Sequence, residues 1–200
     1  MKTVVIAMHY QNEVLDPRGK IKVGVAAENS NRFAVKQNAA RLLNSAREQG
    51  IPVISVRIAF NPGHADVIQN CKIFRDVVAN GAMVEGNWGT EFYEGLGPLD
   101  GEFVVKHSRV NAFYGSQLEE ILRVLKAERL IMAGIATNSV VETSARHAAD
   151  MGYEVIVASD ACSCARPDLH DASLENMRYI AEVRNVEQLL NEARIWRTAE

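Results

Sequence analysis

The chain has 200 residues, of which 48% are hydrophobic and 24% charged, enough for one sizeable core and too few for two comfortable domains. We therefore expect a single domain over residues 1–200. The formal net charge of −3, from 22 basic and 25 acidic residues without a long basic run, excludes the electrostatic signature of a nucleic-acid or anionic-membrane binder. The expected partners are a small molecule and further copies of the chain, in a homodimer or homotetramer.

The first predicted element, residues 3–8, is a short apolar run that fits a buried strand. No small-residue cleavage site follows it, and no later segment approaches the length of a membrane span. The cysteines, Cys71, Cys162 and Cys164, form an odd set without CxxC spacing, which argues against a disulfide framework and a zinc ribbon. A cytoplasmic protein without a metal or other cofactor is expected.

Short runs rich in Val and Ile alternate with longer helical patterns along the rest of the chain. Such continuous apolar runs are typical of strands buried on both faces of a parallel sheet. The predicted strands are residues 3–8, 52–58, 103–106, 130–133, 154–158 and 179–183. The predicted helices are residues 31–49, ended by Gly50, then 117–126, 140–151, ended by Gly152, and 186–193, capped by Asn185.

This regular alternation predicts an α/β fold, a three-layer doubly wound sandwich with a six-stranded, mostly parallel sheet. Residues 61–100 interrupt the alternation, because they contain Gly and Pro at both ends and little strand character. A long excursion beside the carboxyl end of a strand is typical of a lid or an oligomer contact. Ligands of open α/β sheets bind at the same edge.

Three segments carry a resemblance to a known family: AMHYQNE, VVKHSRVNAFYGSQLEEIL and AGIATNSVVETSARHAADMGYEVIVASDAC. In this order they resemble the isochorismatase-like hydrolase superfamily, also called the cysteine hydrolases, which includes nicotinamidases and N-carbamoylsarcosine amidases. The resemblance extends over residues 4–190, apart from the excursion. It implies a six-stranded parallel sheet of the Rossmann-like kind.

The resemblance also implies a catalytic triad of Asp, Lys and Cys, and this chain departs from it. His9 stands at the position of the Asp, Lys106 matches the Lys, and Val140 stands at the position of the Cys. Valine supplies neither a thiolate nor an exchangeable proton, so covalent amide hydrolysis through a thioester is not expected. Ser139 and Ser144 are poor substitutes, since one lies about 100° around the helix from Val140 and the other about one turn deeper.

Some family members lack the cysteine and protonate a vinyl ether while water attacks. His9 is the candidate acid for this route, because its ordinary pKa lies near 6.5. Lys106 beside it would lower the pKa of His9 by repulsion and would make the neutral ring a better base than acid. The alternative is that His9 only fills the volume of the missing carboxyl group.

Lys106 follows a buried apolar run, where a lysine needs an anionic or polar partner. Without the family's Asp, that partner is expected to be a carboxylate of the ligand. Other candidate substrate-binding residues are Gln11, Phe113, Tyr114, Ile135, Ala136 and Ser139. The resemblance implies a cis peptide between Ile135 and Ala136. His64 is interpreted as a loop residue without a metal, and His107 as projecting away from Lys106.

Two functions are consistent with these residues. The first is an isochorismatase-family hydrolase that acts on a small anionic molecule, by acid- or water-mediated hydrolysis without a cysteine nucleophile. The second is a non-catalytic ligand-binding or structural homologue that has lost the triad. A polar cavity shared by His9 and Lys106 would favour the first, and a cavity filled by apolar groups would favour the second.

Overall fold

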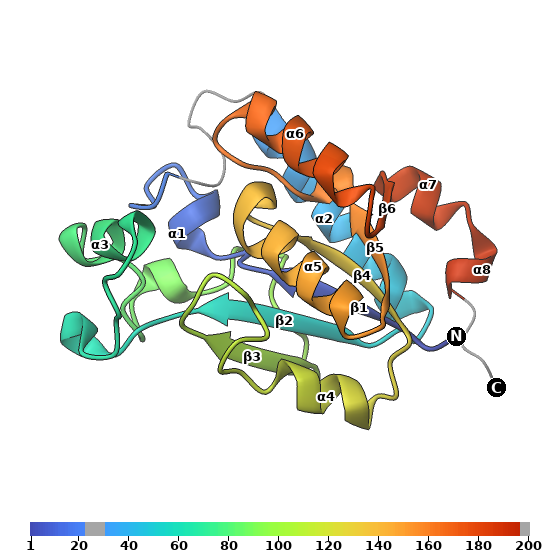
Figure 1. The fold of residues 1–200 in the computed structure, drawn as a ribbon, viewed down its shortest axis with the longest axis horizontal. Coiled ribbons are helices and arrows are strands. Elements are labelled where there is room, and N and C mark those ends of the chain that lie inside the picture. The colour runs from blue at the N-terminus through green and yellow to red at the C-terminus, as the bar shows by residue number, and fades with distance from the viewer. Residues whose placement is uncertain (23–30, 197–200) are drawn as a thin grey trace.

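The computed structural model describes residues 1–22 and 31–196 and contains one parallel sheet of six strands (Figure 1). The apolar runs of the sequence form these strands, and β1 and β4 are buried along their whole length. The strands are β1 (Thr3–Met8), β2 (Val53–Ile58), β3 (Phe103–His107), β4 (Arg129–Gly134), β5 (Glu154–Ala158) and β6 (Glu182–Arg184). The predicted fold class is confirmed.

Helices cover both faces of the sheet. Figure 1 shows α5 in front of the sheet, α4 beside β3, and α2 behind. The α-helices are α1 (Asn12–Leu15), α2 (Asn31–Glu48), α3 (Lys72–Ala79), α4 (Leu118–Val124), α5 (Glu142–Asp150), α6 (Pro167–Met177), α7 (Val186–Leu190) and α8 (Ala193–Trp196). Gly50 and Gly152 follow α2 and α5 in the left-handed region, and Asn185 caps α7, as predicted.

The strand order β3-β2-β1-β4-β5-β6 reverses direction between β1 and β4, so their carboxyl ends form the switch point of the sheet. Doubly wound sheets bind ligands in the crevice outside this point. Gly134 ends β4 opposite Met8 of β1. A Cβ atom on Gly134 would lie 2.2 Å from the carbonyl oxygen of Met8, so only glycine allows the two strand ends to approach this closely.

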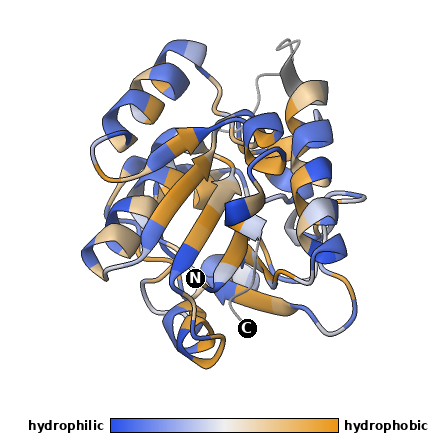
Figure 2. Ribbon diagram, turned by 90° about the vertical axis from the view of Figure 1, so that its right-hand side faces the viewer, coloured by the Kyte–Doolittle hydropathy of each residue, from blue (hydrophilic) through white to orange (hydrophobic). Residues whose placement is uncertain are grey.

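The core lies between the sheet and its helices. In Figure 2 the strands are mostly hydrophobic, while the helices on either side mix hydrophilic and hydrophobic residues. The described residues contain no helix long and apolar enough to cross a membrane. The sixth strand was predicted too early, because residues 179–181 still belong to the turn after α6, where the N–H groups of Ile180 and Ala181 donate to Met177.

The predicted excursion, residues 61–100, contains α3 and two short 3-10 turns, Pro62–His64 and Trp88–Thr90. His64 lies in the first turn, and its ring Nε2 bonds to the carbonyl oxygen of Ala82 at 2.7 Å. Phe74 and Val77 of α3 are buried against the rest of the molecule. The excursion is therefore packed onto the carboxyl edge of the sheet.

Candidate active site

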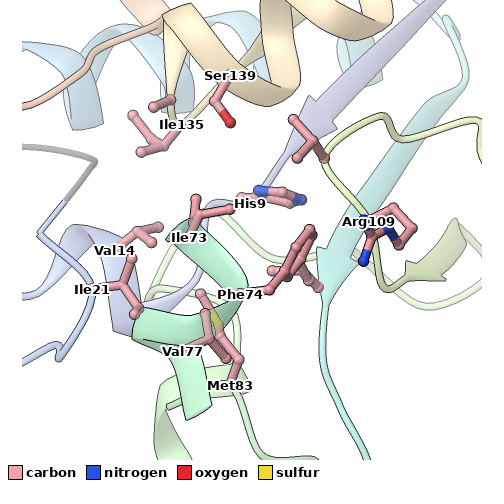
Figure 3. Close-up of a pocket in the computed structure, with 13 residues that line it drawn as sticks. His9, Val14, Ile21, Ile73, Phe74, Val77, Met83, Arg109, Ile135 and Ser139 are labelled. Carbon is pink, nitrogen blue, oxygen red and sulfur yellow. The ribbon is translucent and has the colours of Figure 1, made fainter. Parts of the chain in front are cut away.

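A small cavity of about 40 Å³ lies at the carboxyl ends of β1 and β4, at the switch point. This is room for about three water molecules, at about 10–15 Å³ each. The cavity is lined in part by His9, Ile135, Ala136 and Ser139. In Figure 3 the His9 ring lies between α3 and the pair formed by Ile135 and Ser139. Most remaining walls are apolar, from Val14, Ile21, Ile73, Phe74, Val77 and Met83.

His9 is the first residue after β1 and has a left-handed backbone, with a φ of 58°. Non-glycine residues adopt this conformation mainly at turns and functional sites. Its N–H donates to the carbonyl of Val56 at 2.9 Å, which ties the turn to β2. His9 is 7% exposed, and its ring forms part of the cavity wall.

The side chain that contacts His9 is His107, at the end of β3. The two Nε2 atoms lie 2.5 Å apart, and the ring planes are inclined by 24° with centroids 4.8 Å apart, so the rings meet through their nitrogen edges. His107 Nδ1 lies 3.1 Å from the carbonyl oxygen of Asn111. His107 projects away from Lys106, as expected, but its contact with His9 was not predicted, so His107 is the site residue that sequence reasoning missed.

Both histidines are held in their neutral forms. Burial, and then the charge of His107, holds the pKa of His9 well below 6.5, although a hydrogen bond to the Ile135 backbone raises that pKa. Burial lowers the pKa of His107 to about 4, against a smaller opposing effect of the Asn111 carbonyl. At neutral pH the pair therefore carries no charge and can accept a proton.

Lys106 does not lie beside His9. Its ammonium group pairs with Glu85 at 2.7 Å, and 40% of its side chain is exposed. Successive residues of a strand point to opposite faces, so Lys106 and His107 cannot both face His9. The hypotheses of a cation that lacks a protein partner and of Lys106 as the cause of the lowered His9 pKa are wrong.

Arg109 is the charged side chain that lines the cavity. Its guanidinium group lies over the Phe74 ring, 4.1 Å from the centroid. Within the described part of the chain it donates to two neutral oxygens, the Ile68 carbonyl and the Asn70 side chain, at 3.1 and 2.9 Å. An anion beside it would therefore meet a cation that is not already neutralised by these partners.

Val140 lies in a π-helical turn, Thr137–Val141, that precedes α5 directly. It is 1% exposed and does not belong to the residues that line the cavity. The peptide between Ile135 and Ala136 is cis, as the resemblance implies. Ile135, Ala136 and Ser139 do line the cavity, so these three predicted residues lie together with His9.

The other predicted substrate-binding residues lie elsewhere. Gln11 is fully buried, and its amide group bonds to the backbone of Ile58 and Thr90 at 2.9 to 3.0 Å. Phe113 stacks on His147, with ring centroids 4.8 Å apart, and Tyr114 is 69% exposed. None of these predicted residues lines the cavity, since the Gln11 amide is occupied by backbone groups and the loop after β3 turns Phe113 toward α5 and Tyr114 toward the solvent.

The hydroxyl and thiol groups near the site have structural partners. Ser144 is fully buried and accepts a hydrogen bond from the Ala112 N–H at 3.0 Å. Burial raises the pKa of the Cys162 thiol to about 12 and also raises the pKa of Cys164. These groups are therefore poor nucleophiles at neutral pH. The described residues contain no group of three or more His, Cys, Asp or Glu side chains placed to hold a metal ion.

Comparison with known proteins agrees with this architecture. Residues 3–188 match the model of the isochorismatase domain. YecD of Escherichia coli O157:H7, an isochorismatase family protein, is 32% identical over 158 residues, which cover 78% of this chain and 82% of YecD. Maleamate amidohydrolase of Pseudomonas putida is 30% identical over 145 residues, which cover 70% of this chain and 65% of that enzyme.

The fold is also similar to a solved cysteine hydrolase from Pseudomonas syringae pv. phaseolicola, with a TM-score of 0.86 at 22% identity. The match covers 98% of this chain and 94% of that structure. A likeness at this identity supports the fold alone, while the domain match extends over nearly the whole chain. This chain therefore belongs to the isochorismatase family of hydrolases.

Proposed function

We propose that this protein hydrolyses a small molecule with water as the nucleophile and His9 as the base, without a covalent intermediate. The observation that supports this most directly is the contact between His9 and His107 at the wall of the cavity. In this proposal His9, His107 and Val140 take the places that Asp, Lys and Cys hold in the triad of the family. The residue at the lysine position is then His107, one position after Lys106.

The proposed step needs only a water molecule and the neutral ring of His9. One proton of the water passes to His9, and the water oxygen forms a bond to an electrophilic carbon of the substrate. The bond from that carbon to the leaving nitrogen or oxygen then breaks, and the same proton passes from His9 to the leaving atom. A base positioned in this way contributes about 10²–10⁴-fold to a hydrolysis rate.

We propose that the substrate has an anionic group. The cation that would bind this group is Arg109 and not Lys106, which is paired with Glu85. This guanidinium group lies at the cavity and donates to neutral oxygens within the described chain. A carboxylate can accept two parallel hydrogen bonds from a guanidinium group. The apolar walls suit a short hydrocarbon body between that carboxylate and the bond to be cleaved. Maleamate, the substrate named for a relative, has this composition.

The cavity must widen to admit such a substrate, because about 40 Å³ holds only a few waters. We propose that α3 moves, since Ile73, Phe74 and Val77 close the cavity on the side opposite Ile135 and Ser139 (Figure 3). In this role α3 is the lid within residues 61–100. A lid of this kind excludes water other than the one that reacts.

The experiment is a hydrolysis screen with maleamate, ureidoacrylate and isochorismate, using wild type, His9→Asn and Lys106→Met. We expect one compound to be hydrolysed, His9→Asn to lower kcat by about 10²-fold or more, and Lys106→Met to retain wild-type activity. Equal activity of His9→Asn and wild type would exclude His9 as the base. If Lys106→Met loses activity and His9→Asn does not, Lys106 and not His9 is the catalytic residue.

The second candidate is a non-catalytic binding protein, and the small, mainly apolar cavity favours it. Under this alternative the histidines only fill the site, and α3 remains closed over it. The same compounds would then raise the melting temperature without being hydrolysed, because binding to the folded state alone stabilises it. Thermal shift and product formation, measured on the same samples, separate the two candidates.

A further inference from the structure

The hydrogen-bond partners of His107 determine where its proton resides. The carbonyl oxygen of Asn111 lies 3.1 Å from Nδ1 and can only accept a hydrogen bond. Nδ1 of His107 must therefore carry a proton. In a neutral imidazole the other nitrogen is then an acceptor, so Nε2 of His107 presents a lone pair to His9.

The contact between the two rings determines the tautomer of His9 in turn. Two nitrogen atoms 2.5 Å apart need a proton between them, because two facing lone pairs would repel. Since Nε2 of His107 is the acceptor, Nε2 of His9 is the donor. The remaining nitrogen of His9, Nδ1, is then unprotonated and is the basic atom of the ring.

The loop that presents the Asn111 carbonyl is fixed at several points. The Asn111 side chain accepts from the Phe113 N–H at 2.8 Å, and the Ala112 N–H donates to Ser144 at 3.0 Å. Ser144 belongs to α5 and is fully buried. The Asn111 carbonyl is therefore held in place by contacts with α5. Because it stays beside His107 Nδ1, it keeps the proton of His107 on that nitrogen.

We propose that His107 is a positioning residue, which passes the orientation of the Asn111 carbonyl to His9 and thereby keeps His9 Nδ1 free to accept the proton of the reacting water. This inference rests on the proposed function, in which His9 is the base. It assigns to His107 and Asn111 the task of selecting a tautomer, as the carboxylate does in serine hydrolases.

The same hydrogen bonds also stabilise the protonated state that forms during the reaction. Two contacts of the rings need a proton, His107 with Asn111 and His9 with His107, and the two ring protons of the neutral pair supply them. A proton taken up by His9 therefore goes to Nδ1, the nitrogen that makes neither contact. The pair is therefore built to hold one added proton for the short time before it passes to the leaving group.

Few other charges act on this pair. Arg109 lines the same cavity and opposes a second positive charge there. Glu13 of α1 is buried, and its carboxylate accepts from the Lys20 and Met83 N–H groups at 2.6 and 3.3 Å. Lys106 is paired with Glu85 on the other face of β3. The proton balance of the site is thus controlled mainly by His9 and His107 themselves.

The test is the ring-nitrogen NMR spectrum of the ¹⁵N-histidine-labelled full-length protein at pH 7.5, assigned with one His→Gln variant per histidine. We expect His107 to be protonated at Nδ1 and unprotonated at Nε2, and His9 to have the opposite pattern. The reverse tautomer of either ring, or rapid exchange between tautomers in both, would overturn the inference. This measurement needs no substrate, so it fails or succeeds independently of the proposed function.

Kinetics of the hydrolysed compound then test the effect on catalysis. His107→Leu removes the acceptor for His9 and is expected to lower kcat by about 10²-fold with little change in KM. His107→Gln retains an amide oxygen that can accept from His9 and is expected to recover part of the loss. His147→Gln is the matched control, because His147 is half-buried, stacks on Phe113 and does not line the cavity. Equal losses in the Leu and Gln variants would reject tautomer selection.

Discussion

At the scale of single residues, the chemistry of this site depends on which neighbour faces His9. Lys106 and His107 are adjacent in the sequence, but strand alternation points them to opposite faces of β3. Lys106 pairs with a half-exposed glutamate, a kind of ion pair that contributes about 0–1 kcal/mol. His107 is 2% exposed and touches His9. Of these two residues, only His107 can influence the protonation of His9 by direct contact.

The first prediction concerns thiol reagents. Cys162 and Cys164 are buried with raised pKa values, and Cys71 is partly exposed. Iodoacetamide at pH 7 is therefore expected to label Cys71 and to leave the hydrolytic rate unchanged, because the thiolate is the reactive form. Peptide mass spectrometry locates the label. Stoichiometric inactivation together with labelling of Cys162 or Cys164 would contradict a mechanism without cysteine.

The second prediction concerns reconstruction of the family triad. Val140→Cys is expected to fold, at a cost below about 1.5 kcal/mol, and to remain a poor amidase while His9 is unchanged. The triple variant His9→Asp, His107→Lys, Val140→Cys is expected to hydrolyse maleamate faster than the double variant that keeps His107. Equal amidase rates of the triple and the double variant would mean that a lysine at position 107 is not needed and that Lys106 is the lysine of the triad.

The residue-level predictions from sequence were partly correct for a physical reason. His9, Ile135, Ala136 and Ser139 were placed in one site because they follow β1 and β4, whose carboxyl ends must meet in a parallel sheet. The partner of His9 was missed because β3 is an edge strand with only partial burial, so its hydrophobic pattern did not distinguish its two faces. The available signal was the two-residue period of a strand, which puts His107 on the same face as the apolar Val105 and Lys106 on the other face; Val105 and His107 are both buried.

At the scale of elements, Gly134 controls how closely β1 and β4 end beside each other. We expect Gly134→Ala to lower the free energy of unfolding by about 3 kcal/mol, because its Cβ would lie 2.2 Å from the Met8 carbonyl oxygen. Gly95→Ala is the control, since a Cβ there meets nothing within 4 Å and costs only the left-handed backbone, about 1–2 kcal/mol. Equal losses in urea denaturation would contradict close strand approach.

Most elements could be predicted because their apolar runs and caps act locally. The strand from 154 to 158 and the Asn185 cap match the structure, and α2 ends one residue before its predicted end. The sixth strand was misplaced because β6 is short and half-buried at the sheet edge, which leaves a weak pattern. Tyr179 was assigned to this strand although it is 90% exposed.

At the scale of the whole molecule, the neutral histidine pair links stability to pH. His107 has a pKa of about 4 in the folded protein and near 6.5 when unfolded, so the unfolded chain binds more protons between these values. The stability from this source is complete above pH about 6.5 and is lost as the pH falls toward 4. At about 1.36 kcal/mol per pH unit, the loss is about 3 kcal/mol.

Urea denaturation of wild type and His107→Gln between pH 7.5 and 4 measures this linkage. The variant lacks the titrating ring, so the difference between the two free energies is expected to change in favour of the variant as the pH falls. Carboxylates titrate in both proteins and cancel in the difference. A difference that stays constant over this range, or that changes in favour of wild type, would show that His107 is not held neutral by folding.

The hydrolysis that we propose proceeds through water and not through a covalent enzyme intermediate. The most direct measurement is the intact mass of the protein, quenched in acid during steady-state turnover of the compound that is hydrolysed fastest. Because Val140 cannot be acylated and His9 transfers only protons, we predict a single species at the mass of the unmodified chain. A second species heavier by the acyl group of the substrate, formed and lost with turnover, would show that the enzyme is acylated and would exclude direct attack by water.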